Sequence, residues 1–232
     1  MRSVARAALV AAALLLAACA QVQPLPPLPV AVSYAMPAAD ASFYEKAAAA
    51  GQQVLAIDPA RSLIVVTVRR GGPLARLGHD HVVASHDLRG MVAPALGRAD
   101  FGFRLDQLVV DETALRDEAK LETTPSPEAI AGTRHNMLSR VLEAERFPQV
   151  ALQVAAAPGA DGQLQLSVTL HGVTRTLPVR TTLARTAAGL TASGAFTLKQ
   201  SDFGITPMSI MNGAMTVQDT LELRYRIVAG KP

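Results

Sequence analysis

The sequence contains no tryptophan, one cysteine and few aromatic residues, which make up 4% of the chain. The single cysteine, Cys19, excludes a disulfide within the chain. No run of lysine or arginine occurs, so the charge pattern of a nucleic-acid-binding protein is missing. Of the 22 basic side chains two, Arg2 and Arg6, lie at the N-terminus, which leaves 20 against 19 acidic ones. The formal charge of +3 therefore indicates no anionic partner.

Motifs for nucleophilic catalysis and for nucleotide binding are also missing. The sequence has no Gly-x-Ser-x-Gly turn, no histidine paired with a serine in a recognisable context and no phosphate-binding glycine loop. We therefore predict a protein without enzymatic activity and without a resident cofactor.

The N-terminus has the pattern of an export signal. A positive start precedes an apolar stretch at residues 7–16, which is too short to span a bilayer. Leu-Ala-Ala-Cys at residues 16–19 resembles a bacterial lipobox, whose cysteine is diacylated when the leader is removed. We interpret residues 1–18 as a signal peptide and Cys19 as a lipid-anchored first residue in the periplasm. Ala20, in place of aspartate, favours the outer membrane. The alternative is an ordinary secretory leader with an incidental cysteine.

A tether is predicted after Cys19. Residues 21–37 contain five prolines, and at about 3.1 Å per residue such an extended segment reaches roughly 50 Å. A short helix is predicted over residues 40–51, with Asp40 or Ser42 as its cap and Gly51 at its end. The domain organisation is therefore a lipid-anchored segment over residues 19–51 and one β domain over residues 52–230.

Short runs of alternating apolar and polar residues fill most of the chain from residue 52 onward, which predicts strands. We place them at residues 54–58, 62–70, 79–84, 88–94, 99–110, 150–156, 163–170, 173–183, 190–199 and 217–228. Asp161-Gly162 and His171-Gly172 are predicted hairpin turns. About eight of the strands are long. This pattern alone permits a sandwich or a closed barrel.

One stretch, residues 132–154, has a different period. Four apolar residues stand at helical spacing: Met137, Leu138, Val141 and Leu142. Pro125 and Pro127 precede them, where proline suits a helix start, and Pro148 disfavours the helical conformation at Phe147. We predict a single helix that ends at Phe147 and covers one open end of the sheet or barrel.

Several short motifs recur in a characteristic order between residues 54 and 228. They are Ile57-Asp58-Pro59 with Ser62, Gly90, Leu138-Ser139-Arg140, Phe147-Pro148, Thr169-Leu170-His171-Gly172-Val173-Thr174-Arg175, Gly194-Ala195-Phe196, Ser201-Asp202-Phe203-Gly204-Ile205 and Val217-Gln218-Asp219. In order and spacing they resemble the YceI-like family of periplasmic proteins. The resemblance implies a mainly β fold, an extended eight-stranded antiparallel lipocalin-like barrel, with a polyisoprenoid chain held inside. The sequence departs from the family at Gly78-His79-Asp80-His81, where many members have one histidine.

Period-two alternation and the family resemblance assign a set of residues to the interior. They are Val66, Val68, Phe101, Phe103, Leu105, Val150, Leu152, Val168, Leu170, Val179, Phe196, Leu221, Leu223 and Tyr225. An eight-stranded barrel can be filled by such side chains or hold one slender ligand. The lack of tryptophan and of aromatic bulk favours a cavity. At about 25 cal/mol per Å², burial of an isoprenoid chain would suffice for tight binding.

The histidines at residues 79, 81 and 86 form the sharpest candidate for a polar site. His79 and His81 share one face of a strand, which suits two ligands of one metal ion. A third ligand would come from His86, Asp80 or His135. The cluster could instead be a polar rim in which Asp80 orients an imidazole, or a contact to a lipid head group such as a quinone carbonyl. His171 is explained by its turn.

Three methionines, Met208, Met211 and Met215, are predicted either to pack in the core or to line a portal. Together these observations favour a non-enzymatic carrier for a polyisoprenoid or a similar amphiphilic lipid, such as an isoprenoid quinone. The alternatives are a metal- or redox-linked protein that uses His79, His81 and His86, and a structural module whose barrel is filled.

Overall fold

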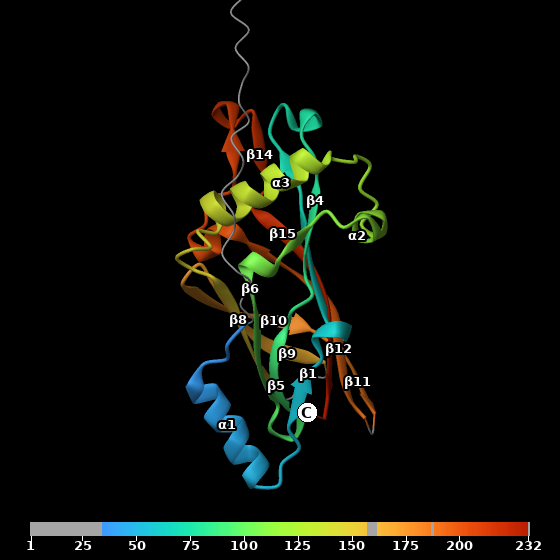
Figure 1. The fold of residues 1–232 in the computed structure, drawn as a ribbon, viewed down its shortest axis with the longest axis vertical. Coiled ribbons are helices and arrows are strands. Elements are labelled where there is room, and N and C mark those ends of the chain that lie inside the picture. Colours follow the sequence, from blue (N-terminus) through green and yellow to red (C-terminus); the bar gives the residue numbers. More distant parts are fainter. Residues whose placement is uncertain (1–33, 157–161, 187, 232) are drawn as a thin grey trace, which may run out of the picture.

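The computed structural model describes residues 34–156, 162–186 and 188–231. Within these ranges the protein is mainly β, as predicted, and one large antiparallel sheet curls along the long axis of the molecule (Figure 1). The helices are α1 (Ala38–Ala49), α2 (Thr113–Glu118) and α3 (Pro127–Asn136). The strands are β1 (Leu55–Ile57), β2 (Leu63–Val68), β3 (Arg70–Gly71), β4 (His81–Ser85), β5 (Arg89–Ala93), β6 (Arg98–Arg104), β7 (Val109–Val110), β8 (Gln149–Ala156), β9 (Gln163–Leu170), β10 (Val173–Arg180), β11 (Thr182–Thr186), β12 (Gly189–Lys199), β13 (Ser209–Ile210), β14 (Met215–Val217) and β15 (Thr220–Gly230). None of the described helices is long and apolar enough to cross a membrane.

The large sheet has the strand order β10-β9-β8-β6-β5-β1-β15-β2-β4-β7, and β12 pairs with both β15 and β11. In the described chain no ladder joins β10 to β12. Instead β10 pairs with β9, β11 pairs with β12, and Thr181 connects β10 to β11. The expected closed barrel is therefore corrected to a curled sheet. The gap in this sheet lies between β10 and β12, and the chain crosses it because β11 follows β10 directly and pairs with β12.

The prediction of one continuous strand over residues 99–110 is wrong. It ends at Arg104, a 3-10 turn covers Leu105–Gln107, and the chain resumes as β7, which pairs with β4 instead of β5. Arg134 of α3 stabilises this bend by donating hydrogen bonds to the carbonyl oxygens of Asp106 at 2.6 Å and Leu108 at 3.2 Å. The bend carries the chain from β6 to the edge strand β7 beside β4. Helix α3 then lies across that end of the sheet (Figure 1).

The helix predicted before Phe147 begins as expected but ends early. Ser126 caps α3 and Pro127 occupies its first turn. A single π-helical turn, Met137–Val141, follows α3 and holds three of the four apolar residues that predicted the helix, while the fourth, Leu142, ends it. Glu143 then has a positive φ of 44° and its carbonyl accepts hydrogen bonds from the amides of Arg146 and Phe147. A turn therefore separates the helix from Pro148. The prediction of a single covering helix also missed α2.

Helix α2 covers the outer face of β2 and β4. Leu115 of α2 packs with Val65, Val82 and Ala84 in a small buried cluster, whereas Ile64 and Val83 belong to the main core inside the sheet. Both faces of these strands are thus buried, which is why their sequences are apolar without a strict alternation.

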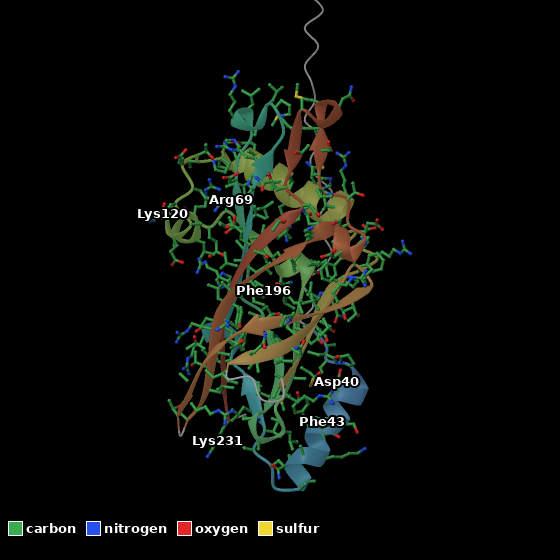
Figure 2. The ribbon with its side chains drawn as sticks, turned by 180° about the vertical axis from the view of Figure 1, so that it is seen from behind. Asp40, Phe43, Arg69, Lys120, Phe196 and Lys231 are labelled. Carbon is green, nitrogen blue, oxygen red and sulfur yellow. The ribbon has the colours of Figure 1, made fainter. Side chains whose placement is uncertain are left out.

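Residues 34–51 also pack on the sheet, although the sequence placed the start of the domain near Gln52. The predicted short helix forms as α1, and Gly51 follows it with a φ of 75°. The Tyr44 hydroxyl donates a 2.6 Å hydrogen bond to Asp100 of β6, and Arg98 links Asp100 to Asp40 of α1. Figure 2 labels Asp40 and Phe43 on this helix, beside one end of the sheet. The domain therefore extends to at least Tyr34, which is itself buried.

Several of the motifs that resemble the YceI-like family form turns. Asp58 caps the 3-10 turn between β1 and β2, and Ser62 exchanges hydrogen bonds with the backbone of Val228 where that turn interrupts the ladder. The His171-Gly172 hairpin forms as predicted, with φ values of 52° and 74°. A Cβ on Gly172 would lie 2.8 Å from the Phe147 ring, so glycine also allows this ring to pack on the hairpin. Asp161 of the other predicted turn lies outside the described residues.

Candidate functional site: an elongated apolar cavity

A cavity of about 650 Å³ runs inside the curled sheet. All fourteen residues that the sequence assigned to the interior line it. Their common orientation follows from the strand pairing. Phe101 lies opposite Leu152, and Leu152 lies opposite Val168, so that inward side chains form layers across β6, β8 and β9. Phe196, labelled in Figure 2, lies away from both ends of the sheet. The volume falls within the range of about 300–1,000 Å³ that is usual for small-molecule sites.

The wall of the cavity is almost wholly apolar along its length. Polar residues are concentrated near its two ends: Arg69, Arg70, His79 and His81 lie at one end, and Arg98 and Arg185 lie at the other. Several of these cations have partners. Arg69 pairs with Glu222 and Asp80, and Arg98 pairs with Asp40 and Asp100. Such a cavity suits an extended apolar chain better than a compact charged molecule.

One polar pair lies between the ends. The Tyr225 hydroxyl is 2.7 Å from the Thr181 hydroxyl, and both residues line the cavity. Burial raises the pKa of Tyr225, although the hydrogen bond between its hydroxyl and that of Thr181 partly opposes this. The two hydroxyls satisfy each other, so the pair adds little polarity to the wall.

His79 and His81 lie side by side at the end that α3 covers, with ring centroids 6.2 Å apart. Nδ1 of His81 is 2.6 Å from Asp111 Oδ2. Because an ionised carboxylate only accepts hydrogen bonds, His81 donates from Nδ1, which leaves Nε2 available to another partner. Nδ1 of His79 is buried and has no hydrogen-bond partner in the described part of the chain. The two imidazoles therefore offer hydrogen-bonding capacity that the described protein does not fully use.

Asp111 and Arg116 support His81 and were not predicted from the sequence. The Asp111 side chain is 0% exposed, and its Oδ1 accepts hydrogen bonds from Arg116 at 2.5 Å and from the Val82 amide at 3.1 Å. Burial raises the pKa of Asp111, but the hydrogen bonds from His81, Val82 and Arg116 outweigh it and hold the pKa below 3.8. Arg116 also donates to the carbonyls of Asp80 and Thr123. Asp111 thus orients the His81 ring, the role that the sequence had given to Asp80.

The three histidines suggested as metal ligands, His79, His81 and His86, do not lie together in the structure. His86 is exposed and pairs with Glu112 at 2.7 Å, while His79 and His81 line the cavity. No group of three or more His, Cys, Asp or Glu side chains within the described ranges has the arrangement of a metal site. Asp80 is held by Arg69 and Arg70, and His135 lies on α3. Of the three methionines, Met208 and Met215 line the cavity and Met211 is exposed beside it.

The fold and its cavity define a class of protein, a curled antiparallel sheet around an elongated apolar space. The chain belongs to the family of YceI-like domains, whose sequence profile matches residues 56–229. No curated protein gives a significant match to the sequence.

Two solved structures are similar in fold at low sequence identity. A polyisoprenoid-binding domain from Saccharophagus degradans, implicated in plant cell wall breakdown, is 12% identical with a TM-score of 0.55. The match covers 78% of this chain and 99% of that domain. BcnA from Burkholderia cenocepacia is 15% identical with a TM-score of 0.51, over 74% of this chain and 98% of BcnA.

Proposed function

We propose that this protein binds and carries an amphiphilic lipid of the polyisoprenoid type in the periplasm, without catalysing a reaction. The observation that carries the proposal is the continuous apolar wall of the cavity, from Phe103 and Leu152 to Leu190 and Leu221. An extended chain buries apolar surface along such a wall and gains about 25 cal/mol per Å². Membership of the YceI-like family and the polyisoprenoid-binding domain of similar fold support this ligand class.

We further propose that the head group of the lipid lies beside His79 and His81. Both imidazoles line the cavity near one end, and Asp111 fixes the His81 ring through Nδ1. His81 Nε2 would then donate or accept one hydrogen bond, depending on its protonation. A head-group hydroxyl fits the neutral His81 ring, because it can donate to Nε2, whereas the carbonyl oxygen of a quinone fits the protonated ring, whose Nε2 donates.

The anchor belongs to the same proposal. An acylated Cys19 followed by the proline-rich tether would hold the cavity near a membrane, with the outer membrane favoured by Ala20. The tether is shorter than residues 21–37 suggest, because Tyr34 already packs against β6.

Organic extraction of the purified full chain, followed by mass spectrometry, tests the ligand class. Leu152→Trp sharpens the test, since Leu152 lies in the cavity wall between Phe101 and Val168. Overpacking a filled core costs about 1–3 kcal/mol of unfolding free energy. In a hollow sheet we expect a smaller cost and a several-fold loss of recovered lipid.

Gln153→Trp is the matched control, because Gln153 is exposed on the opposite face of the same strand. We expect this variant to retain lipid. A wild-type protein from its native cell that yields no extractable isoprenoid, together with strong destabilisation by Leu152→Trp, would show that the sheet is filled and that the carrier proposal is wrong.

A further inference from the structure

Two chain tips project beyond the end of the large sheet that lies nearest to His79. One tip is the turn from Gly72 to Gly78, and the other is the segment from β13 to β14 (Figure 1, top). A second sheet, with the order β13-β14-β3, joins them, and the Leu74 amide donates a 2.8 Å hydrogen bond to the Ala214 carbonyl. The two tips therefore form one structural unit.

This unit exposes large apolar side chains. Leu77 is 61% exposed, Ile210 is 43% exposed and Met211 is 63% exposed. Scattered apolar side chains on a surface need no explanation, but a group of them on adjoining tips indicates an interaction surface. We call Arg76, Leu77, Ile210 and Met211 the rim.

The rim is continuous with the cavity. Leu77 and Ile210 are exposed to solvent and also line the cavity, together with Ala75 and the two methionines 208 and 215. Apolar side chains therefore lead from the outermost tips to the interior of the sheet, beside the polar residues Arg69, Arg70, His79 and His81 that line the same end of the cavity. A lipid that crossed the rim would not have to expose its chain to water on the way.

The charges around the rim have one sign. No acidic residue occurs at residues 71–79 or 203–218. Arg76 is exposed and forms no ion pair with the described residues, whereas the nearby Asp80 is neutralised by Arg69 and Arg70. Exposed apolar tips beside an unpaired cation match the interface of a bilayer with anionic lipids.

We propose that the rim docks on the surface of a lipid bilayer that contains anionic head groups, so that the cavity opens onto the membrane. This inference rests on the proposed lipid-carrier function and adds where the carrier exchanges its lipid. Leu77, Ile210 and Met211 enter the head-group region, and Arg76 contacts lipid phosphates. Among the described residues, the opposite end of the sheet carries two exposed leucines. Leu96 lies on the turn between β5 and β6, and Leu183, which is 38% exposed, lies on β11.

Single-cysteine probes in the full chain test the orientation of docking. Cys19→Ser removes the native thiol and the acyl site, and Leu77→Cys, Ile210→Cys or Leu96→Cys then carries an environment-sensitive fluorophore. Leu96 is the matched control, because it is 47% exposed at the opposite end. With phosphatidylglycerol-containing vesicles we expect a blue shift at positions 77 and 210 and none at position 96. If the vesicles were bound by the apolar leader alone and the rim did not dock, the fluorescence shifts at positions 77 and 210 would not differ from the shift at position 96.

Vesicle flotation gives an independent measurement. We expect the triple change Leu77→Asn, Ile210→Asn and Met211→Asn to lower the partition coefficient about tenfold or more, because three apolar side chains lose their burial. Arg76→Glu should lower binding to anionic vesicles and leave binding to pure phosphatidylcholine vesicles unchanged. An unchanged midpoint of thermal unfolding would show that the substitutions at these exposed positions do not unfold the protein.

The outcomes separate docking from lipid carriage. Equal shifts at positions 77, 210 and 96, or no shift at any of them, would overturn docking by the rim. A shift at 77 and 210 that needs no vesicles and grows with protein concentration would assign the rim to a second copy of the chain. If isoprenoid is extracted but the rim does not bind vesicles, docking is refuted and the carrier function is not. If the rim docks but no isoprenoid is extracted, the carrier function is refuted and docking is not.

Discussion

Asp111 is the residue on which the polar end of the cavity depends. Its carboxylate is fully buried, yet it holds His81 and Arg116 at the same time. A buried charge is tolerated only when its hydrogen bonds are satisfied, and here both oxygens are bonded. Asp111 has a φ of 59°, a conformation that asparagine also adopts readily. Replacement by asparagine therefore removes the charge with little backbone strain.

We expect Asp111→Asn to lower the free energy of unfolding by about 3–5 kcal/mol at neutral pH, since Arg116 would remain buried without its carboxylate. The folded-state pKa of Asp111 is below its ordinary value of 3.8, so its stabilising contribution is present above that pH and is lost as the pH falls through the depressed pKa. Urea unfolding at several pH values should show this acid-dependent loss in the wild type and a smaller one in the variant.

Asp117→Asn is the control for that measurement, because Asp117 is exposed on the same helix. It should change stability by less than about 0.5 kcal/mol. Equal destabilisation by the two substitutions would contradict the central role given to Asp111.

The interior residues were predictable, whereas the partners of the histidines were not. Period-two alternation, a local signal, was used together with the family resemblance to assign residues such as Phe103 and Leu152 to the interior, and both line the cavity. His81 and Asp111 are 30 residues apart in the sequence, and their contact depends on the bend after β6, which no local sequence pattern predicts. The run Val82-Val83-Ala84 was the available signal, because a strand that is apolar on both faces requires a cover such as α2.

Among the elements, β6 is approached closely at Gly102 by the segment that precedes α1. A Cβ on Gly102 would lie 2.3 Å from the Val150 carbonyl oxygen and 2.4 Å from the Tyr34 ring. Burial, with Asp40 and Asp100 nearby, raises the pKa of Tyr34 to about 12. Glycine at this position therefore lets the segment before α1 pack directly on the sheet.

Gly102→Ala should reduce the free energy of unfolding by about 1–3 kcal/mol and speed hydrogen exchange in α1, because strand β8 or Tyr34 has to move. Gly132→Ala in α3 provides a control of opposite sign. No atom lies within 4 Å of a Cβ there, and alanine favours a helix interior by about 1 kcal/mol over glycine. A similar effect of both changes on urea unfolding would refute the close-approach argument.

Elements with a strong local pattern were predicted well, and those set by tertiary contacts were not. The β9–β10 hairpin followed from His171-Gly172. The early end of the covering helix did not, since Glu143 adopts a positive φ that the sequence around Phe147-Pro148 does not specify. The break between β6 and β7 depends on hydrogen bonds from Arg134, a residue of a different element.

At the scale of the whole molecule, the remaining prediction concerns attachment to a membrane. If residues 16–19 are a lipobox, Cys19→Ser should abolish acylation and leave the chain unprocessed or free of lipid, because the cysteine thiol of a lipobox is the acyl acceptor. Cell fractionation and intact mass of the wild type and the variant measure this. A wild-type protein from its native cell that is soluble and carries no acyl mass would show that the lipobox interpretation is wrong.

The position of β15 has a consequence for the order in which the protein can be made. This strand pairs with β12 along its length, with β2 near its start and with β1 near its end, where Ala56 meets Gly230. The first and last strands of the domain are thus neighbours, and contacts so distant in sequence form late in folding. A growing chain cannot join the two halves of the sheet before residue 230 has been synthesised. Until then β1 and β2 lack the strand that lies between them, so the interior of the sheet stays open along that side.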